Sequence, residues 1–145
     1  MQSVRSGDRW MLRLDENEDV LGAVTEFARR EEIRAAALLG GIGQVRRATI
    51  GYWDGTQYCP RELSVPHEVL ALSGSIAQAD GAPSVHLHLT ASGPDFEVVG
   101  GHLLGATVGA LLELPVATFP GRTFGRPMSE TLGLRRLDLE PGADV

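Results

Sequence analysis

Hydrophobic and polar residues alternate near the start of the chain and then change period. Trp10, Leu12 and Leu14 alternate with Met11, Arg13 and Asp15, and this period of two predicts a strand that ends in an acidic turn. A helix should follow, capped by Asn17 or Asp19 and ending in the charged run 29–32. Its apolar positions recur at helical spacing: Val20, Leu21, Val24, Phe27 and Ala28.

The remaining pattern consists of strands separated by turn-forming residues. Strands are predicted within 33–53, at 68–77, in a hairpin around 84–105, at 105–119 and, as a last short strand, within 131–140. Turns are predicted at 54–55, 80–81 and 120–121, and the end of the chain, 141–145, should be loosely held. One helix among many strands predicts an α+β fold, in which the helix packs on a largely antiparallel or mixed β-sheet. The length predicts a single domain, 1–145, with its core at about 8–138.

The charge balance argues against nucleic acid as a partner. The chain carries 19 acidic and 13 basic residues, all of the latter arginine, and its formal net charge is −6. An acidic surface repels phosphates unless its arginines gather on one face, and the pairs at 29–30, 46–47 and 135–136 lie far apart in sequence.

No apolar run approaches the roughly 20 residues of a membrane span, and no signal peptide is evident, so a cytoplasmic location is expected. A lone cysteine, Cys59, excludes an internal disulfide and a CxxC motif.

Three of the four histidines lie in the segment "SVHLHLTASGPDFEVVGGHLLG", residues 84–105. In a strand, His86 and His88 project to one face while Leu87 and Leu89 project to the other. If the chain returns as a hairpin in which paired residue numbers sum to 188 or 190, His102 joins the first two histidines on the same face. Three neutral imidazoles suit zinc, nickel, iron or copper and leave one coordination position open. An odd register would instead leave unrelated histidines on a polar sheet face.

Four further groups are candidates for acid/base chemistry or for orienting a histidine: Glu68, Glu97, Glu113 and His67. Glu68 begins the strand before the hairpin, so it is the candidate catalytic residue, a proton carrier beside the histidines. A glutamate at a strand end is, equally, an ordinary solvated side chain. His67 follows Pro66 in an expected loop and is predicted to be exposed.

Two glycine-containing motifs do not support a binding function. "GGIGQV" has Arg46 where a dinucleotide fingerprint needs its third glycine, and a strand rather than a helix is expected to follow. "TFGRPM", residues 123–128, contains the Gly-Arg-Pro core of an AT-hook, but Phe124 stands where the first arginine would be. We therefore interpret the first as a bend and the second as a turn.

Taken together, three longer stretches resemble the PPC domain family, also called DUF296: "HLHLTASGPDFEVVGGHL", "PHEVLALSGSIAQADG" and "AALLGGIGQVRRATIGYWD". The first is similar to the family's H-x-H followed by G-G-H-L, and the likeness extends over residues 8–138. It implies an α+β fold similar to that of acetolactate decarboxylase, assembly into a homotrimer, and a metal held by His86, His88 and His102. Family members are often labelled DNA-binding by analogy with plant forms, but this sequence has no AT-hook and is acidic.

The leading hypothesis is therefore a homotrimeric metal-binding protein of unknown substrate. Its three-histidine site would take a divalent transition metal, zinc first and then nickel or iron, and would stay open to water or a small-molecule ligand. Such a site leaves open whether the protein is an enzyme, for example a metal-dependent hydrolase or lyase. The alternative is a module that binds DNA or another protein, in which the histidines are structural or vestigial.

Overall fold

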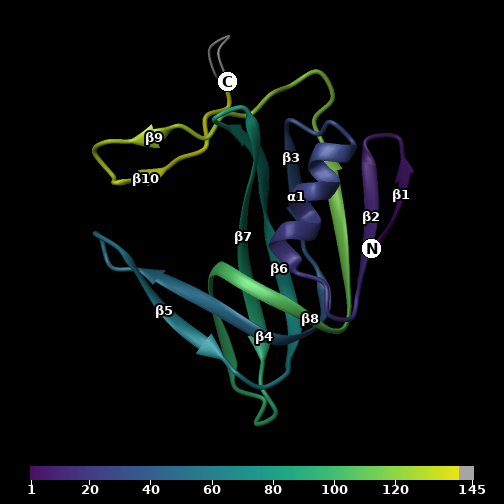
Figure 1. The fold of residues 1–145 in the computed structure, drawn as a ribbon, viewed down its shortest axis with the longest axis vertical. Helices are drawn as coiled ribbons and strands as arrows, with labels where there is room; N and C mark the ends of the chain where they lie inside the picture. The colour runs from purple at the N-terminus through teal and green to yellow at the C-terminus, as the bar shows by residue number, and fades with distance from the viewer. Residues whose placement is uncertain (141–145) are drawn as a thin grey trace.

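The computed structural model describes residues 1–140 and contains one helix and ten strands within them (Figure 1). The predicted loose end at 141–145 lies outside the described residues. The elements, in chain order, are β1 (Gln2–Ser6), β2 (Arg9–Asp15), α1 (Val20–Arg30), β3 (Ala36–Leu39), β4 (Ile42–Trp53), β5 (Tyr58–Leu63), β6 (His67–Ala79), β7 (Ala82–Ser92), β8 (Val98–Thr118), β9 (Met128–Ser129) and β10 (Leu134–Arg135).

The main sheet is antiparallel and partly closes on itself. Its order is β1-β2-β8-β3-β6-β4-β5, and β7 pairs with both β6 and β8. Because β4 also pairs with β6 and with β8, the strands β6, β7, β8 and β4 form a closed circuit of pairings. The expected α+β class, a largely antiparallel sheet with one helix, is confirmed.

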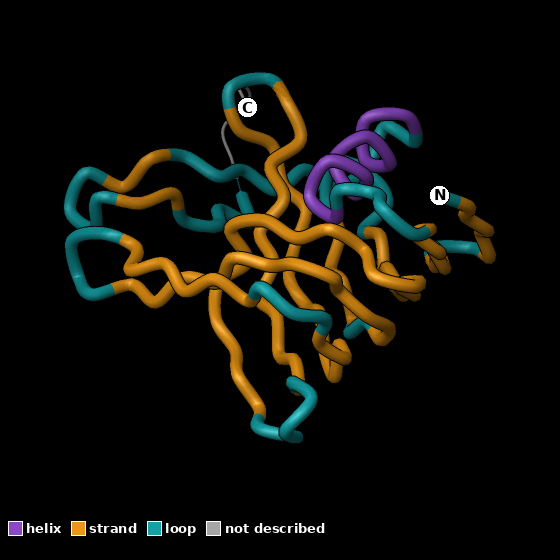
Figure 2. The backbone as a smooth tube through the Cα atoms, turned by 60° about the horizontal axis from the view of Figure 1, so that its bottom comes forward, coloured by secondary structure: helices purple, strands orange, loops and turns teal. Residues whose placement is uncertain are grey.

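Helix α1 covers one face of this sheet (Figure 2). Its first turn is capped by Asp19, whose carboxylate accepts a hydrogen bond from the Gly22 N–H at 2.7 Å. Four of the five predicted apolar positions are buried and Leu21 is half-buried, and Phe27 packs edge-on against Trp10 of β2 with ring centroids 5.1 Å apart. Burial of this stripe against the sheet, rather than intrinsic helix propensity, holds a helix of only 11 residues in place.

Strand β7 divides the molecule into a core face and a polar face. Leu87 and Leu89 are buried in the hydrophobic core, whereas His88 is exposed and His86 half-buried. The neighbouring strand β6 approaches β7 very closely at Gly74, where an added Cβ would lie 1.9 Å from the carbonyl oxygen of His86. Glycine is therefore required there, because any side chain would push the two strands apart.

The strand pattern differs from the sequence prediction in two ways. β1, β5 and β9 were not predicted, because β1 has one apolar residue, β5 contains Pro60, which is tolerated in an edge strand, and β9 has only two residues and begins where a turn was expected. Residues 98–118, expected as two strands, form the single strand β8. Register shifts in its pairing with β4 let this long strand change partners along its length. The predicted last short strand is confirmed as β10.

Within residues 1–140, no helix is both long enough and apolar enough to cross a membrane.

Candidate metal centre

The three histidines of the 84–105 segment converge on one face of β7 and β8. His88 of β7 lies directly opposite His102 of β8, so the paired residue numbers sum to 190, as the even register predicted. His86 lies two residues before His88 and opposite Ser75 of β6. All three rings therefore project from the same side of the sheet.

The ring nitrogens are close enough to share one ion. One nitrogen from each histidine lies within 4.8 Å of the other two, and the Nε2 atoms of His86 and His88 are 3.1 Å apart. Two nitrogens on a tetrahedral zinc, with Zn–N bonds of about 2.0–2.1 Å, lie about 3.3 Å apart. The pair thus already has nearly the spacing that a shared metal needs.

The protonation state of the cluster suits a metal ligand. Burial, followed by the positive charge of Arg126, lowers the pKa of His86 to about 4. Burial also lowers the pKa of His102, with His88 and Arg126 contributing. Both rings are consequently neutral at pH 7, and a neutral imidazole has the free lone pair that binds a metal. In addition, Nδ1 of His102 is buried and has no hydrogen-bond partner in the described structure.

Two neighbours of the cluster come from distant segments, and sequence reasoning missed both. Tyr58 of β5 stacks on His102 with ring centroids 4.5 Å apart and an angle of 17°. Arg126, in the loop before β9, donates hydrogen bonds to His86 Nδ1 at 2.8 Å and to Ser75 Oγ at 2.7 Å. The only sequence feature that marked Arg126 was "TFGRPM", which was interpreted as a turn.

The candidate proton carrier Glu68 does not lie beside the histidines. Its carboxylate accepts a hydrogen bond from Gln44 of β4, and its strand partner is Ser92. Ser92 is four residues beyond His88 along β7, which corresponds to about 13 Å of extended strand. A catalytic role for Glu68 stays a prediction, and its position gives that prediction no support.

The other candidate groups are also apart from the cluster. His67 was expected to be exposed, but it is buried, and its Nδ1 lies 2.8 Å from the carbonyl oxygen of Val65. Glu97 lies in the turn between β7 and β8, and Glu113 faces Arg13 of β2 in the strand register. The three-histidine cluster therefore gathers without a side chain from any of these four positions.

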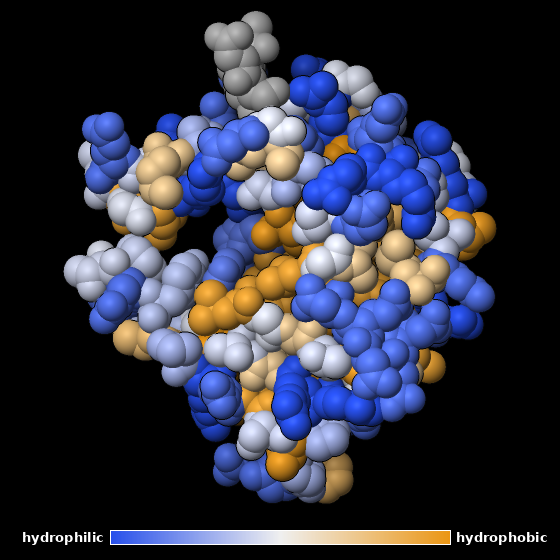
Figure 3. All heavy atoms as spheres, viewed as in Figure 1, coloured by the Kyte–Doolittle hydropathy of each residue, from blue (hydrophilic) through white to orange (hydrophobic). Residues whose placement is uncertain are grey.

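The cluster is bordered by two projecting parts of the fold. β5, with Tyr58, belongs to one of them, and the segment that leads from Arg126 into β9 belongs to the other; both project on the same side (Figures 1 and 2). A hollow opens between these two projections in the space-filling view (Figure 3). Since His102 touches Tyr58 and His86 touches Arg126, the histidines lie between the same two segments. Of the three, His88 is exposed to solvent.

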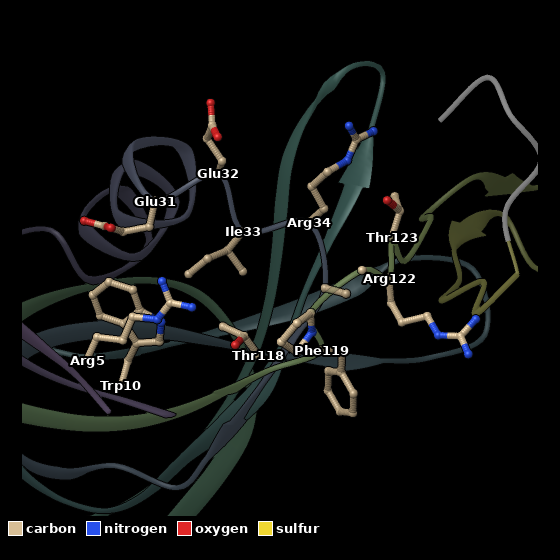
Figure 4. Close-up of a pocket in the computed structure, with 13 residues that line it drawn as sticks. Arg5, Trp10, Glu31, Glu32, Ile33, Arg34, Thr118, Phe119, Arg122 and Thr123 are labelled. Carbon is tan, nitrogen blue, oxygen red and sulfur yellow. The ribbon is translucent and has the colours of Figure 1, made fainter. Parts of the chain in front are cut away.

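A different hollow, of about 370 Å³, lies at the C-terminal end of α1 (Figure 4). It contains no histidine, and its charges have both signs. The guanidinium of Arg5 lies 5.6 Å from the ring centre of Trp10, and Glu31 is paired with Arg30. The convergent titratable groups that characterise a reactive site are found at the histidine cluster instead.

Solved structures with the same fold are known. A metal-containing protein from Archaeoglobus fulgidus is 37% identical, with a TM-score of 0.83 over 91% of this chain and 94% of its own. A protein from Ralstonia eutropha JMP134, provisionally named a DNA-binding protein, is 30% identical, with a TM-score of 0.87 over 95% of this chain and 96% of its own. A Staphylococcus aureus protein similar to α-acetolactate decarboxylase matches at a TM-score of 0.55 and 12% identity, over 83% of this chain and 54% of its own. That last likeness concerns the fold alone.

Curated relatives and a family model extend the comparison. The bifunctional protein GlmU of Synechococcus sp. (strain JA-2-3B'a(2-13)) is 33% identical over 133 residues, or 91% of this chain. The chain spans only 20% of the length of that relative. The model of the Plants and Prokaryotes Conserved (PCC) domain matches residues 1–120, the region that carries the histidine cluster. The chain therefore belongs to the Plants and Prokaryotes Conserved domain family, as its sequence motifs indicated.

Proposed function

We propose that this protein binds one divalent transition-metal ion per chain through His86, His88 and His102. The observation that carries the proposal is the convergence of three ring nitrogens within 4.8 Å. The low pKa of His86 and the unpartnered Nδ1 of His102 fit the same role. Zinc suits three imidazoles best, and nickel or iron would fit the same ligands. With three protein ligands, one position stays open for water or a small molecule, the arrangement in which a metal activates water or polarises a carbonyl group.

The test is metal analysis of the purified protein after supply of zinc, nickel and iron. Near-stoichiometric loading is expected, and His88→Ala should lose it while its circular dichroism spectrum stays native, since His88 is exposed. The matched control is His67→Gln, which changes the one histidine outside the cluster and should keep the metal. Wild-type protein that takes up none of the three metals would disprove the proposal.

Assembly into a homotrimer is the second part of the proposal. It is supported by large apolar side chains left exposed on the sheet: Met11, Leu39, Ile42 and Leu70, which line a surface hollow of about 430 Å³. Met11 alternates with the buried Leu12, so this apolar face lies opposite the core. A contiguous exposed apolar face of this kind is typical of a surface that another chain covers.

Light scattering after size-exclusion chromatography measures the mass of the assembly directly. The wild type should have three times the chain mass of 15.5 kDa, and Ile42→Asp should reduce the mass to that of one chain. Val4→Asp makes the same change at an exposed valine on the edge strand β1 and should leave the trimer intact. A monomeric wild type would contradict this part of the proposal.

DNA binding remains the alternative, because the Ralstonia relative carries that provisional name. The distribution of charge opposes it. Members of all three arginine pairs are engaged with acidic side chains, as in Arg29–Glu26, Arg46–Glu16 and Arg135–Asp80. A gel shift that persists in chelator and weakens as salt is raised would favour DNA binding over the metal-site proposal, since phosphate contacts release counterions.

A further inference from the structure

Arg126 is a buried cation without a buried anion. Arg126 as a whole is only 5% exposed, and its Nε atom is buried with no hydrogen-bond partner. Its side-chain partners, His86 Nδ1 and Ser75 Oγ, are both uncharged groups. Among residues 1–140, no carboxylate forms an ion pair with it. A guanidinium stays protonated in proteins, and burying it without a counterion is costly, so this arrangement needs a reason.

The hydrogen bond from Arg126 also fixes the tautomer of His86. A guanidinium has only donors, so His86 Nδ1 must accept the bond, and the proton of the neutral ring must lie on Nε2. Nε2 is the atom that lies 3.1 Å from His88 Nε2, in the position to bind a metal. A metal on Nε2 would move the proton to Nδ1, where one N–H donor would face another at 2.8 Å. Metal binding and the Arg126–His86 hydrogen bond are therefore mutually exclusive.

Loss of that bond frees the N–H groups of Nη1 next to His86, and Nη2, which uses only one of its two N–H groups on Ser75 Oγ, completes the end-on fork of the guanidinium. Nη2 stays anchored on Ser75 Oγ, so the guanidinium does not have to leave its place. A planar guanidinium with a pair of free N–H groups matches the two oxygens of a carboxylate. A carboxylate also supplies the single negative charge that the buried arginine lacks.

We propose that the histidine site binds a small carboxylate ligand through Arg126, and that metal and carboxylate bind with positive cooperativity. This inference rests on the proposed metal site and names the ligand class of that site. The carboxylate relieves the conflict between Arg126 and metal-bound His86, so each ligand strengthens the binding of the other. The hollow between the β4–β5 hairpin and the segment before β9 gives the ligand its access (Figure 3).

The experiment measures zinc affinity by competition with a fluorescent chelator, in sodium acetate and in sodium chloride at equal ionic strength. Acetate is expected to raise the zinc affinity of the wild type about tenfold, the effect of a ligand present at about ten times its dissociation constant. In chloride, Arg126→Gln should bind zinc more tightly than the wild type, because the opposing donor and its charge are gone. The same variant should lose the enhancement by acetate.

Matched controls separate this role from a general charge effect. Arg61→Gln removes an exposed arginine of β5 and should leave both affinities at the wild-type values. Arg126→Lys keeps the charge but not the planar fork, and its enhancement by acetate should be clearly smaller. If Arg126→Gln does not fold, Arg126→Lys still separates a carboxylate held by the guanidinium from acetate bound directly at the open position of the metal.

Two outcomes would overturn the inference while leaving the metal site intact. Equal zinc affinity in acetate and chloride would show that no carboxylate is coupled to the metal. An equal enhancement by sodium sulfate would show that the site does not select a carboxylate. Wild-type protein that fails to bind zinc in either salt would instead disprove the proposed metal site itself.

Discussion

The two faces of strand β7 differ in where their neighbours come from. On one face, Leu87 and Leu89 are 0% and 2% exposed and pack in a core that the apolar pattern of the sequence had already indicated. On the other face, His86 and His88 meet His102, but also Tyr58 and Arg126 from segments far away in the sequence. The alternation of apolar and polar residues in β7 thus predicts both faces of the strand. The sequence pattern also predicts what surrounds the apolar face, but it does not predict what surrounds the polar face.

This difference has a physical origin. Apolar burial is non-directional, so any core-facing leucine or valine of the sheet serves as a neighbour. A polar site depends on the direction and distance of individual atoms, and residues from separate loops set these. The two faces should consequently respond to substitution in different ways, and the following three experiments test that separation in order of decreasing effect.

The largest effect is expected on the core face. Leu87→Ala removes a fully buried side chain and should lower the free energy of unfolding by about 2–5 kcal/mol, measured by urea denaturation in chelator. Because Leu87 points away from the histidines, the folded fraction should still load one zinc per chain. Loss of zinc from folded Leu87→Ala protein would show that the two faces are not separable.

A smaller effect is expected from the neighbour that stacks on the site. Tyr58→Leu removes the aromatic ring packed on His102 and should weaken zinc binding by roughly 10–100-fold, as loss of an orienting neighbour does at metal sites. Tyr52→Leu, an exposed tyrosine on β4, is the matched control and should bind zinc as the wild type does. Equal affinities for the two variants would remove Tyr58 from the site.

The smallest effect is expected for the pH dependence of the metal-free protein, because His86 is only half-buried and solvent screening reduces what its pKa shift contributes to stability. Unfolded His86 gains its proton near the ordinary pKa of 6.5, whereas folded His86 gains it only near a pKa of about 4. Between these values the unfolded state binds more protons, so lowering the pH from 6.5 to 4 should lower the free energy of unfolding. Thermal melts in chelator across this range should show the loss, and His86→Gln should make the curve flatter. Identical slopes for the two proteins would exclude His86 as the cause.

The sequence could predict those parts of the fold that depend on local pattern. The capped helix, the buried stripe of α1 and the strand that carries His86 and His88 follow from period and turn residues, and all are confirmed. Placement of His102 needed one further assumption, the even register, which turned out correct. That assumption became reasonable only because a short hairpin leaves few alternatives.

The rest of the candidate site depends on long-range geometry. Nothing in the residues around Tyr58 or Arg126 shows that β5 and the loop before β9 approach the same histidines. Glu68 does not lie beside the histidines, where it was expected, for a related reason. The sequence placed it correctly in strand β6 but gave no measure of its distance from the cluster along that strand. Residues on two paired strands can still lie far apart when the strands are 11 to 21 residues long.

The length of β8 has a consequence for folding kinetics. This single strand pairs with β2, β3, β4 and β7, and it also carries His102. Most of these pairings close large loops, so they should form late and slowly during folding. The β7–β8 pairing is the exception, because it closes a loop of only five residues and brings His102 to His88 before β8 has to meet β2 or β3. A metal ion bound by this hairpin would therefore speed folding as well as slow unfolding.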